Sequence, residues 1–318
     1  MLSGSPELWW LLLADFEITA PEPQPQPTGN DSTPPGTTVQ QPPAVTLSPI
    51  ILPNLATLVF QGLPESVSSP LLSAIVGSKL EKLVATDIST KPMTQPDSNF
   101  QSLLGKVTGS LKRIEITYNE RNSEFGISSE RIVEVPNEWI HHIDECPGLA
   151  IRVKVPPSLP TWDMVAKFVG GLPVPTSDNL LVLQDHSEAS PFPVQTLNEW
   201  DFIAEVEISP AYDPRPLFEH LSRPQTVYPT SDQKWPLPNL TQVYSKRNEA
   251  DSQEMKEALV NFLRRSNAPQ TPNAGAGEEL PPTPPRPKQL QKLKVHSSIL
   301  ESLKEDSTLA GIEIISTS

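Results

Sequence analysis

The chain has 318 residues, of which 38 are prolines and 36% are hydrophobic, and its formal net charge at pH 7 is −14. The negative charge argues against binding to nucleic acid or to an anionic membrane surface, because basic side chains must neutralise the phosphates of both. Cys146 is the only cysteine, which excludes an internal disulfide and a cysteine-based zinc cluster. A single cysteine favours a reducing compartment, so we expect an intracellular protein, cytoplasmic or nuclear.

The first apolar run, residues 8–14, resembles the centre of a signal peptide but has no basic start, and it is too short to span a bilayer. It fits the frame Leu-x-x-Leu-x-Leu through Leu8, Leu11 and Leu13. We interpret residues 1–19 as a partial first repeat. A stack of repeats needs a polar capping unit at its end, so we expect the natural start to lie upstream of Met1.

Residues 20–50 contain a run in which every second residue is proline, from Pro21 to Pro27. Proline fixes φ and has no backbone N–H, so this segment cannot join a sheet. We predict a disordered insertion that leaves the folded part and returns at Leu52.

The Leu-x-x-Leu-x-Leu frame recurs, with Leu-Pro-Asn-Leu at 52–55 and again at 237–240, and further copies begin at Leu80, Leu111 and Leu290. Recurrence with about one helix between copies predicts an irregular leucine-rich-repeat solenoid of the α/β class, in which a curved parallel sheet is covered by backing helices. Residues 51–266 form this solenoid. In each strand alternate residues point in, as Leu58 and Phe60 do, or out, as Thr57 and Val59 do.

The segments that connect consecutive repeat strands show helical periodicity. Apolar residues share one face in 97–107, 161–169 and 251–265, and the last of these begins with a capping box of Asp251 and Glu254. Residues 289–318 carry the final repeat and a C-terminal cap, with a short helix near Ser298 and a strand at 309–315. Between residues 132 and 215 the Leu-x-x-Leu-x-Leu pattern is no longer recognisable, which irregular repeats or a small inserted subdomain would explain.

Groups that could carry chemistry are few. The segment from His141 to Cys146 contains four residue types that bind metals, but no second His/Cys cluster completes a site. Asp185 and His186 lack a Gly-x-Ser-x-Gly elbow, and no phosphate-binding glycine loop is present. The sequence therefore predicts a protein that is not an enzyme and has no metal or cofactor.

A second proline-rich stretch, 267–288, contains Pro281-x-x-Pro284-x-Arg286, the pattern of ligands for Src-homology-3-type grooves. We interpret this stretch as a linker or loop, for which no ligand is needed.

The Leu-Pro-Asn-Leu copies, the helix at 251–265 and the closing unit at 290–304 together resemble the C-terminal part of fungal-type F-box/leucine-rich-repeat proteins. The resemblance implies a substrate-recognition role in a ubiquitin ligase, in which an F-box docks on a Skp-type adaptor and a cullin. No F-box-like stretch precedes the first repeat, so these two partners are expected only if an F-box exists upstream. The alternative is a stand-alone leucine-rich-repeat scaffold.

In either case we expect a protein partner that contacts the outward residues of the strands. Exposed aromatic and arginine side chains are favoured anchors of protein interfaces. The candidate contact residues are Trp10, Thr57, Val59, Lys82, Arg113, Glu115, Gln242, Tyr244, Lys292 and Lys294.

Overall fold

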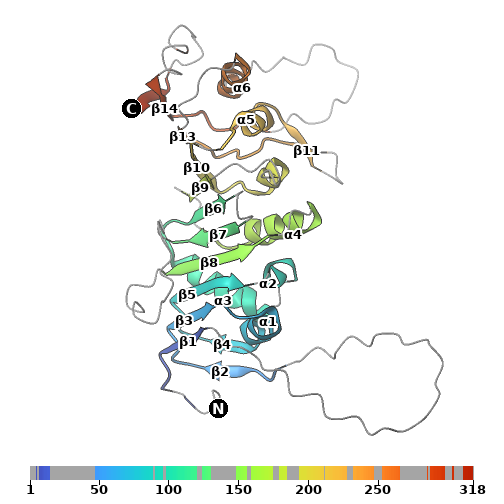
Figure 1. Cartoon of the computed structure of the whole chain (residues 1–318), viewed down its shortest axis with the longest axis vertical. Coiled ribbons are helices and arrows are strands. Elements are labelled where there is room, and N and C mark those ends of the chain that lie inside the picture. The colour runs from blue at the N-terminus through green and yellow to red at the C-terminus, as the bar shows by residue number, and fades with distance from the viewer. Residues whose placement is uncertain are drawn as a thin grey trace, which may run out of the picture.

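The structure is a computed structural model. It describes residues 5, 7–14, 47–88, 90–95, 98–119, 124–129, 148–155, 159–174, 179–184, 193–210, 212–227, 232–246, 253–265, 285, 287–297, 303 and 311–317. These residues form an α/β fold around one large sheet (Figure 1).

The large sheet has eleven strands in the order β1-β3-β5-β8-β7-β6-β9-β10-β13-β14-β15. Every pair of neighbours is parallel except the two pairs that involve β7. The strands are β1 (Trp10–Ala14), β3 (Thr57–Gln61), β5 (Lys82–Ile88), β6 (Glu115–Asn119), β7 (Glu124–Ser128), β8 (Leu149–Lys154), β9 (Asn179–Gln184), β10 (Ile203–Ile208), β13 (Gln242–Ser245), β14 (Lys292–His296) and β15 (Glu313–Thr317).

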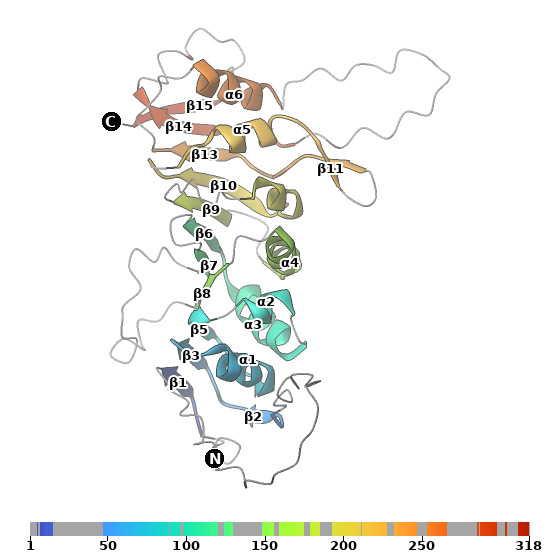
Figure 2. The ribbon, with the colours of Figure 1, turned by 45° about the vertical axis from the view of Figure 1, so that its right-hand side comes forward.

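The helices cover one face of this sheet, as Figures 1 and 2 show from two directions. They are α1 (Glu65–Ala74), α2 (Lys91–Thr94), α3 (Ser98–Ser110), α4 (Leu159–Gly170), the 3₁₀ helix η4 (Val194–Glu199), α5 (Arg215–Leu221) and α6 (Gln253–Arg264). Two short ribbons complete the described part: parallel β2 (Ile50–Leu52) with β4 (Ile75–Gly77), and antiparallel β11 (Gln225–Val227) with β12 (Asp232–Lys234). We call the helix-covered side of the large sheet its inner face and the opposite side its outer face.

The core lies between the inner face and the helices. One continuous row of apolar side chains crosses all eleven strands in register, and its nine central members are buried. The row runs through Leu13, Phe60, Ala85, Ile151, Ile127, Ile116, Leu181, Val206, Val243, Leu293 and Ile314. Because adjacent strands contribute opposite residues to this row, each strand is held in register by its neighbours.

The three expected helices are present. In α3 the predicted face of Phe100, Leu103, Leu104 and Val107 is buried. In α4 Val165, Phe168 and Val169 are buried, and in α6 Ala258, Leu259, Phe262 and Leu263 are buried. Hydrophobic periodicity near 3.6 residues was a sound guide here, because each helix covers the sheet with one face only.

The large sheet is mostly parallel, as expected, but it is not parallel throughout. Strands β6 and β7 form an antiparallel hairpin, and β7 is also antiparallel to β8. A hairpin needs only a short connection, whereas a parallel pair needs a crossover, so β7 joins the sheet directly after β6. As a result β6, β7 and β8 stand in reverse chain order between β5 and β9.

The region 132–215, where the repeat frame fades, contributes β8, β9 and β10 to the same large sheet. Of the first proline-rich insertion (20–50), residues 20–46 lie outside the described residues and β2 begins at Ile50. Most of 267–288 and of the helix expected near Ser298 also lies outside them. The final strand is Glu313–Thr317, later than the predicted 309–315.

Two buried polar side chains tie strands and loops together. Asn179, fully buried at the start of β9, accepts a hydrogen bond from the backbone N–H of Ile114 at 3.0 Å and donates one to the carbonyl oxygen of Phe202 at 3.2 Å. It thereby links the segments that lead into β6 and β10, the two neighbours of β9.

The other is Arg265, which directly follows α6. Its guanidinium donates hydrogen bonds to the carbonyl oxygens of Leu221, Pro236 and Leu237, each at 3.3 Å, and it lies 4.8 Å from the centre of the Phe262 ring. Burial lowers the pKa of Arg265 to about 9. Leu237 has a φ of +44°, a left-handed conformation that costs energy for a leucine, so Arg265 holds a strained turn in place.

Candidate functional site: a hollow on the outer face

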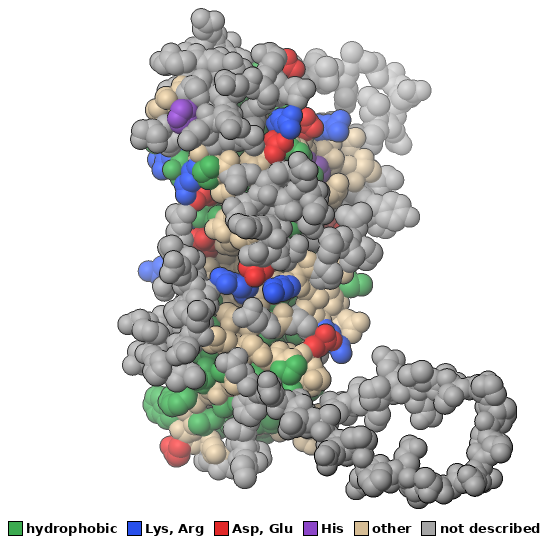
Figure 3. Space-filling model, in the orientation of Figure 1, with side chains coloured by type: hydrophobic (Ala, Val, Ile, Leu, Met, Phe, Trp, Pro, Cys, Tyr) green, Lys and Arg blue, Asp and Glu red, His purple; other side chains and the backbone are tan. Residues whose placement is uncertain are grey.

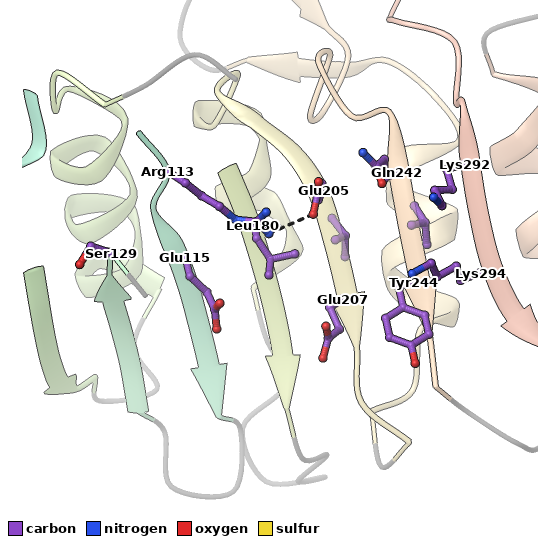
Figure 4. Close-up of a pocket in the computed structure, with 12 residues that line it drawn as sticks. Arg113, Glu115, Ser129, Leu180, Glu205, Glu207, Gln242, Tyr244, Lys292 and Lys294 are labelled. Atoms are coloured by element: carbon purple, nitrogen blue, oxygen red, sulfur yellow. Dashed lines mark hydrogen bonds and ion pairs between the residues drawn. The ribbon is translucent and has the colours of Figure 1, made fainter. Parts of the chain in front are cut away.

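A hollow of about 500 Å³ lies on the outer face over the C-terminal half of the sheet (Figure 4). We call it the outer-face hollow. It is built from five strands and the residues next to them, and not from one loop, so the sheet itself fixes its shape. Its lining residues are Arg113, Glu115, Ser129, Leu180, Glu205, Val206, Glu207, Gln242, Val243, Tyr244, Lys292 and Lys294.

Strand register explains why these residues meet. Side chains alternate between the two faces of a sheet, so residues opposite each other on neighbouring strands lie on the same face. One outward row consists of Glu115, Leu180, Glu205, Gln242, Lys292 and Glu313, on β6, β9, β10, β13, β14 and β15. The next row carries Glu207, Tyr244 and Lys294.

Charges of opposite sign are paired across the strands. The Arg113 guanidinium lies 3.0 Å from a carboxylate oxygen of Glu205, as the dashed line in Figure 4 marks, and the Lys246 ammonium lies 2.6 Å from a carboxylate oxygen of Glu207. Lys292 lies 3.5 Å from Glu313. Glu207 is only 8% exposed, so its bond to Lys246 offsets the cost of removing its charge from water.

Tyr244 lies between two cations. The ammonium groups of Lys246 and Lys294 are each 5.2 Å from the centre of its ring. The face of an aromatic ring attracts cations at such distances. The ring therefore restricts the rotamers of both lysine side chains, of which Lys294 lines the hollow.

The structure brings six of the ten candidate contact residues together in this hollow: Arg113, Glu115, Gln242, Tyr244, Lys292 and Lys294. The four others lie in the N-terminal part of the sheet, which does not line it.

Among these four, Trp10 is 54% exposed on the terminal strand β1, near the end where hydrophobic side chains gather in Figure 3. Thr57 and Lys82 are half-buried on β3 and β5. Val59 belongs to the outer face as expected, but it is only 1% exposed and packs with Leu12, Val84 and Ala150. Val59 is therefore not available as a contact residue.

Sequence reasoning did not find Glu205 and Glu207, which lie in the region where no repeat could be assigned. A usable signal was present, because residues 203–208 read Ile-Ala-Glu-Val-Glu-Ile. This alternation of apolar and polar residues is typical of a strand with one buried face. It would have placed both glutamates on the outward face of their strand, although not opposite Gln242 and Tyr244, because the register between strands depends on distant residues.

A second hollow, of about 430 Å³, lies on the helical side of the molecule and is mostly apolar. It is lined by Met93, Thr94, Gln101, Met164, Lys167, Phe168, Gly171, Leu172 and Pro173. No charge pair crosses it among the interactions of the described residues.

Within the residues that the structure describes, no three His, Cys, Asp or Glu side chains come close enough together to hold a metal ion. The segment 141–146 and the pair Asp185 and His186 lie outside those residues. None of the described helices is long and apolar enough to cross a membrane.

His220 on α5 is the one described histidine with a shifted pKa. Burial lowers its pKa to about 4, and the nearby positive charge of Arg223 adds to the effect. Its Nε2 lies 3.2 Å from Oδ1 of Asn198. His220 lies on the helical side and does not line the outer-face hollow.

Comparison with known proteins adds no assignment. The chain matches no model of a protein family, no curated protein and no solved structure.

Proposed function

We propose that this chain is a protein-binding module of the leucine-rich-repeat type and that its outer face holds the partner. The solenoid assignment is supported by the recurring Leu-x-x-Leu-x-Leu frame and by three features of the fold. The sheet is mostly parallel, helices cover one face only, and the strands follow chain order at both ends of the sheet. The reversed group β6 to β8 is then an irregular unit within the stack.

The observation that carries the proposal is the outer-face hollow. Its floor is a rigid sheet, and its rim offers an arginine, a tyrosine and two lysines from strands that are distant in sequence. Tyrosine and arginine supply a large share of the binding energy in protein interfaces, especially where surrounding contacts exclude water. A surface preorganised in this way loses little conformational entropy when a partner binds.

The composition of the lining favours binding over catalysis. The described lining contains no histidine or cysteine, and Glu205 and Glu207 are each engaged by a basic side chain. Such pairs fix the shape and charge of a recognition surface.

The resemblance to F-box/leucine-rich-repeat proteins makes substrate recognition for a ubiquitin ligase the version of this proposal to test first. In that version the outer face selects the protein to be modified, and a Skp-type adaptor and a cullin co-purify with the natural gene product. Stable partners without these two proteins would instead support a stand-alone scaffold.

The proposal is tested by affinity capture from cell extract, with bound proteins quantified by mass spectrometry. Replacing Arg113 and Tyr244 together by alanine should reduce capture of the specific partner about tenfold or more, since both anchors of the hollow are lost. The matched control replaces Arg152 and Lys154 by alanine, on the same face but outside the hollow. Unchanged capture by the Arg113/Tyr244 variant would contradict the proposal.

A further inference from the structure

The basic side chains around the outer-face hollow differ in how closely carboxylates pair with them. Arg113 and Lys246 are engaged at 3.0 and 2.6 Å by Glu205 and Glu207. Lys294, in contrast, has no described carboxylate within 4 Å and contacts the Tyr244 ring, and Lys292 pairs only at 3.5 Å with Glu313, which is 64% exposed. The described structure thus neutralises the cations on one side of the hollow more fully than those on the other.

Lys292 and Lys294 lie two residues apart on the outer face of β14, and the ammonium group of Lys294 lies 5.2 Å from the centre of the Tyr244 ring (Figure 4). Charges of the same sign repel one another, and partial burial weakens the screening by water. The chain as a whole carries 38 acidic and only 24 basic residues, so a basic cluster stands out against its surface. An anion bound between the lysines would remove the repulsion.

We propose that Lys292, Lys294 and Tyr244 bind an extended segment of a protein partner that carries acidic side chains at alternate positions. The proposal rests on the proposed function and specifies the chemistry of the partner. Lys292 and Lys294 are two residues apart on β14, so their Cβ atoms are separated by about 7 Å along the outer face. Acidic residues two apart in an extended segment have the same spacing on one face, so each carboxylate meets one ammonium.

The acidic side of the hollow sets the position of this segment. Glu115 and Glu207 are each only 8% exposed, and with Glu205 they place negative charge over β6 and β10. A long polyanion laid across the strands would meet these carboxylates, whereas a short segment along β14 avoids them. For this reason a protein segment fits better than the backbone of a nucleic acid.

The test measures fluorescence anisotropy with the full chain and three labelled seven-residue peptides. The first alternates, Ser-Glu-Thr-Glu-Thr-Glu-Ser. The second has the same composition in the order Ser-Glu-Glu-Thr-Thr-Glu-Ser, in which no two glutamates are two residues apart. The third has glutamine in place of each glutamate of the first. We expect the alternating peptide to bind about fivefold or more tightly than the second, and the glutamine peptide not to bind. Binding should weaken as sodium chloride is raised from about 50 to 300 mM.

Variants assign the binding to the two lysines. Lys292→Gln with Lys294→Gln should weaken the alternating peptide about tenfold, as expected for the loss of two partly exposed ion pairs. The matched control, Arg152→Gln with Lys154→Gln, removes two basic residues that are likewise two apart on one strand, β8, outside the hollow, and should leave binding unchanged. Tyr244→Phe should bind as the unmodified chain does, because the ring is kept.

Three results would overturn the inference: equal binding of the two acidic peptides, full binding by the Lys292/Lys294 variant, or equally tight, lysine-dependent binding of a short oligothymidylate. Failure of the inference is distinguishable from failure of the proposed function. If the Arg113/Tyr244 variant loses its protein partner while the Lys292/Lys294 variant keeps it, the outer face binds a partner of different chemistry. If neither variant loses the partner, the outer face is not the binding surface.

Discussion

Arg265 offers the sharpest test of what holds the C-terminal part of the fold together. The perturbation is Arg265→Met, which keeps an unbranched stem over the Phe262 ring and removes every hydrogen-bond donor. In the folded protein the guanidinium bonds to three carbonyl oxygens, of Leu221, Pro236 and Leu237. The carbonyl oxygen of Leu237 also accepts a hydrogen bond from the backbone N–H of Leu240 at 3.1 Å.

The magnitude follows from these contacts. An unsatisfied buried carbonyl costs about 1 to 1.5 kcal/mol, so two of them, together with the weaker third bond, give about 3 kcal/mol. The turn at Leu237, with its φ of +44°, also loses a contact that holds it. Arg265→Lys should cost about 2 kcal/mol, because a single ammonium cannot reach three diverging oxygens with the geometry of a guanidinium.

The assay is urea denaturation followed by tryptophan fluorescence, with the free energy of unfolding taken from the midpoint and slope. Arg264→Met is the matched control, because Arg264 is the adjacent residue, carries the same charge and is exposed. We expect it to change stability by less than about 0.5 kcal/mol. If Arg265→Met and Arg264→Met were equally stable, the three carbonyl contacts would contribute nothing measurable and the reasoning would be refuted.

Three further predictions concern positions elsewhere in the fold. Asn179→Ala should lower the free energy of unfolding by about 3 kcal/mol in the same urea assay, because it leaves a buried N–H and a buried carbonyl unpaired; a loss under about 1 kcal/mol would contradict this. Gly170→Ala should destabilise the fold by about 2 kcal/mol, since a Cβ there would come within 2.8 Å of the Glu199 carbonyl oxygen. Gly109→Ala, whose Cβ would meet nothing within 4 Å, should stabilise it by about 0.5 to 1 kcal/mol. A stability change of the same sign for both variants would count against the packing argument. Burial lowers the pKa of His220 in the folded protein to about 4, so the unfolded chain binds a proton more readily and the free energy of unfolding falls as pH drops from about 6.5 to 4. Allowing for the partial exposure of the ring, His220→Gln should reduce this fall by about 2 kcal/mol between urea melts at pH 7 and pH 4.5. An unchanged pH dependence of stability would show that His220 is not its cause.

The sequence was sufficient for the elements whose periodicity is strong. In α6 the apolar stripe of Ala258, Leu259, Phe262 and Leu263 has one explanation only, and in β3 the alternation of Leu58 and Phe60 with Thr57 settles which side faces the core. Both patterns are local, so one chain segment contains all the information needed to predict them.

The pairing between strands was harder to predict from the sequence, because it depends on residues far apart in the chain. Nothing in the segment 124–128 alone distinguishes an antiparallel strand from a parallel one, since period-2 alternation is common to both. The hollow was found only in part for the same reason. Six outward residues could be named from the repeat frame, but Glu205 and Glu207 lie where that frame fails, and only the sheet register brings them beside Tyr244.

The reversed order of β6, β7 and β8 also limits how such a chain can change by gain or loss of units. In a regular repeat array one unit can be deleted and its neighbours brought together, because each unit contacts only the units next to it in sequence. Here β5 pairs with β8 and β6 pairs with β9, so removing any one of the three central strands would leave a gap that no adjacent segment could close. The three strands must therefore be inherited, deleted or transplanted as one piece, and they divide the protein into two arms whose lengths are free to vary independently.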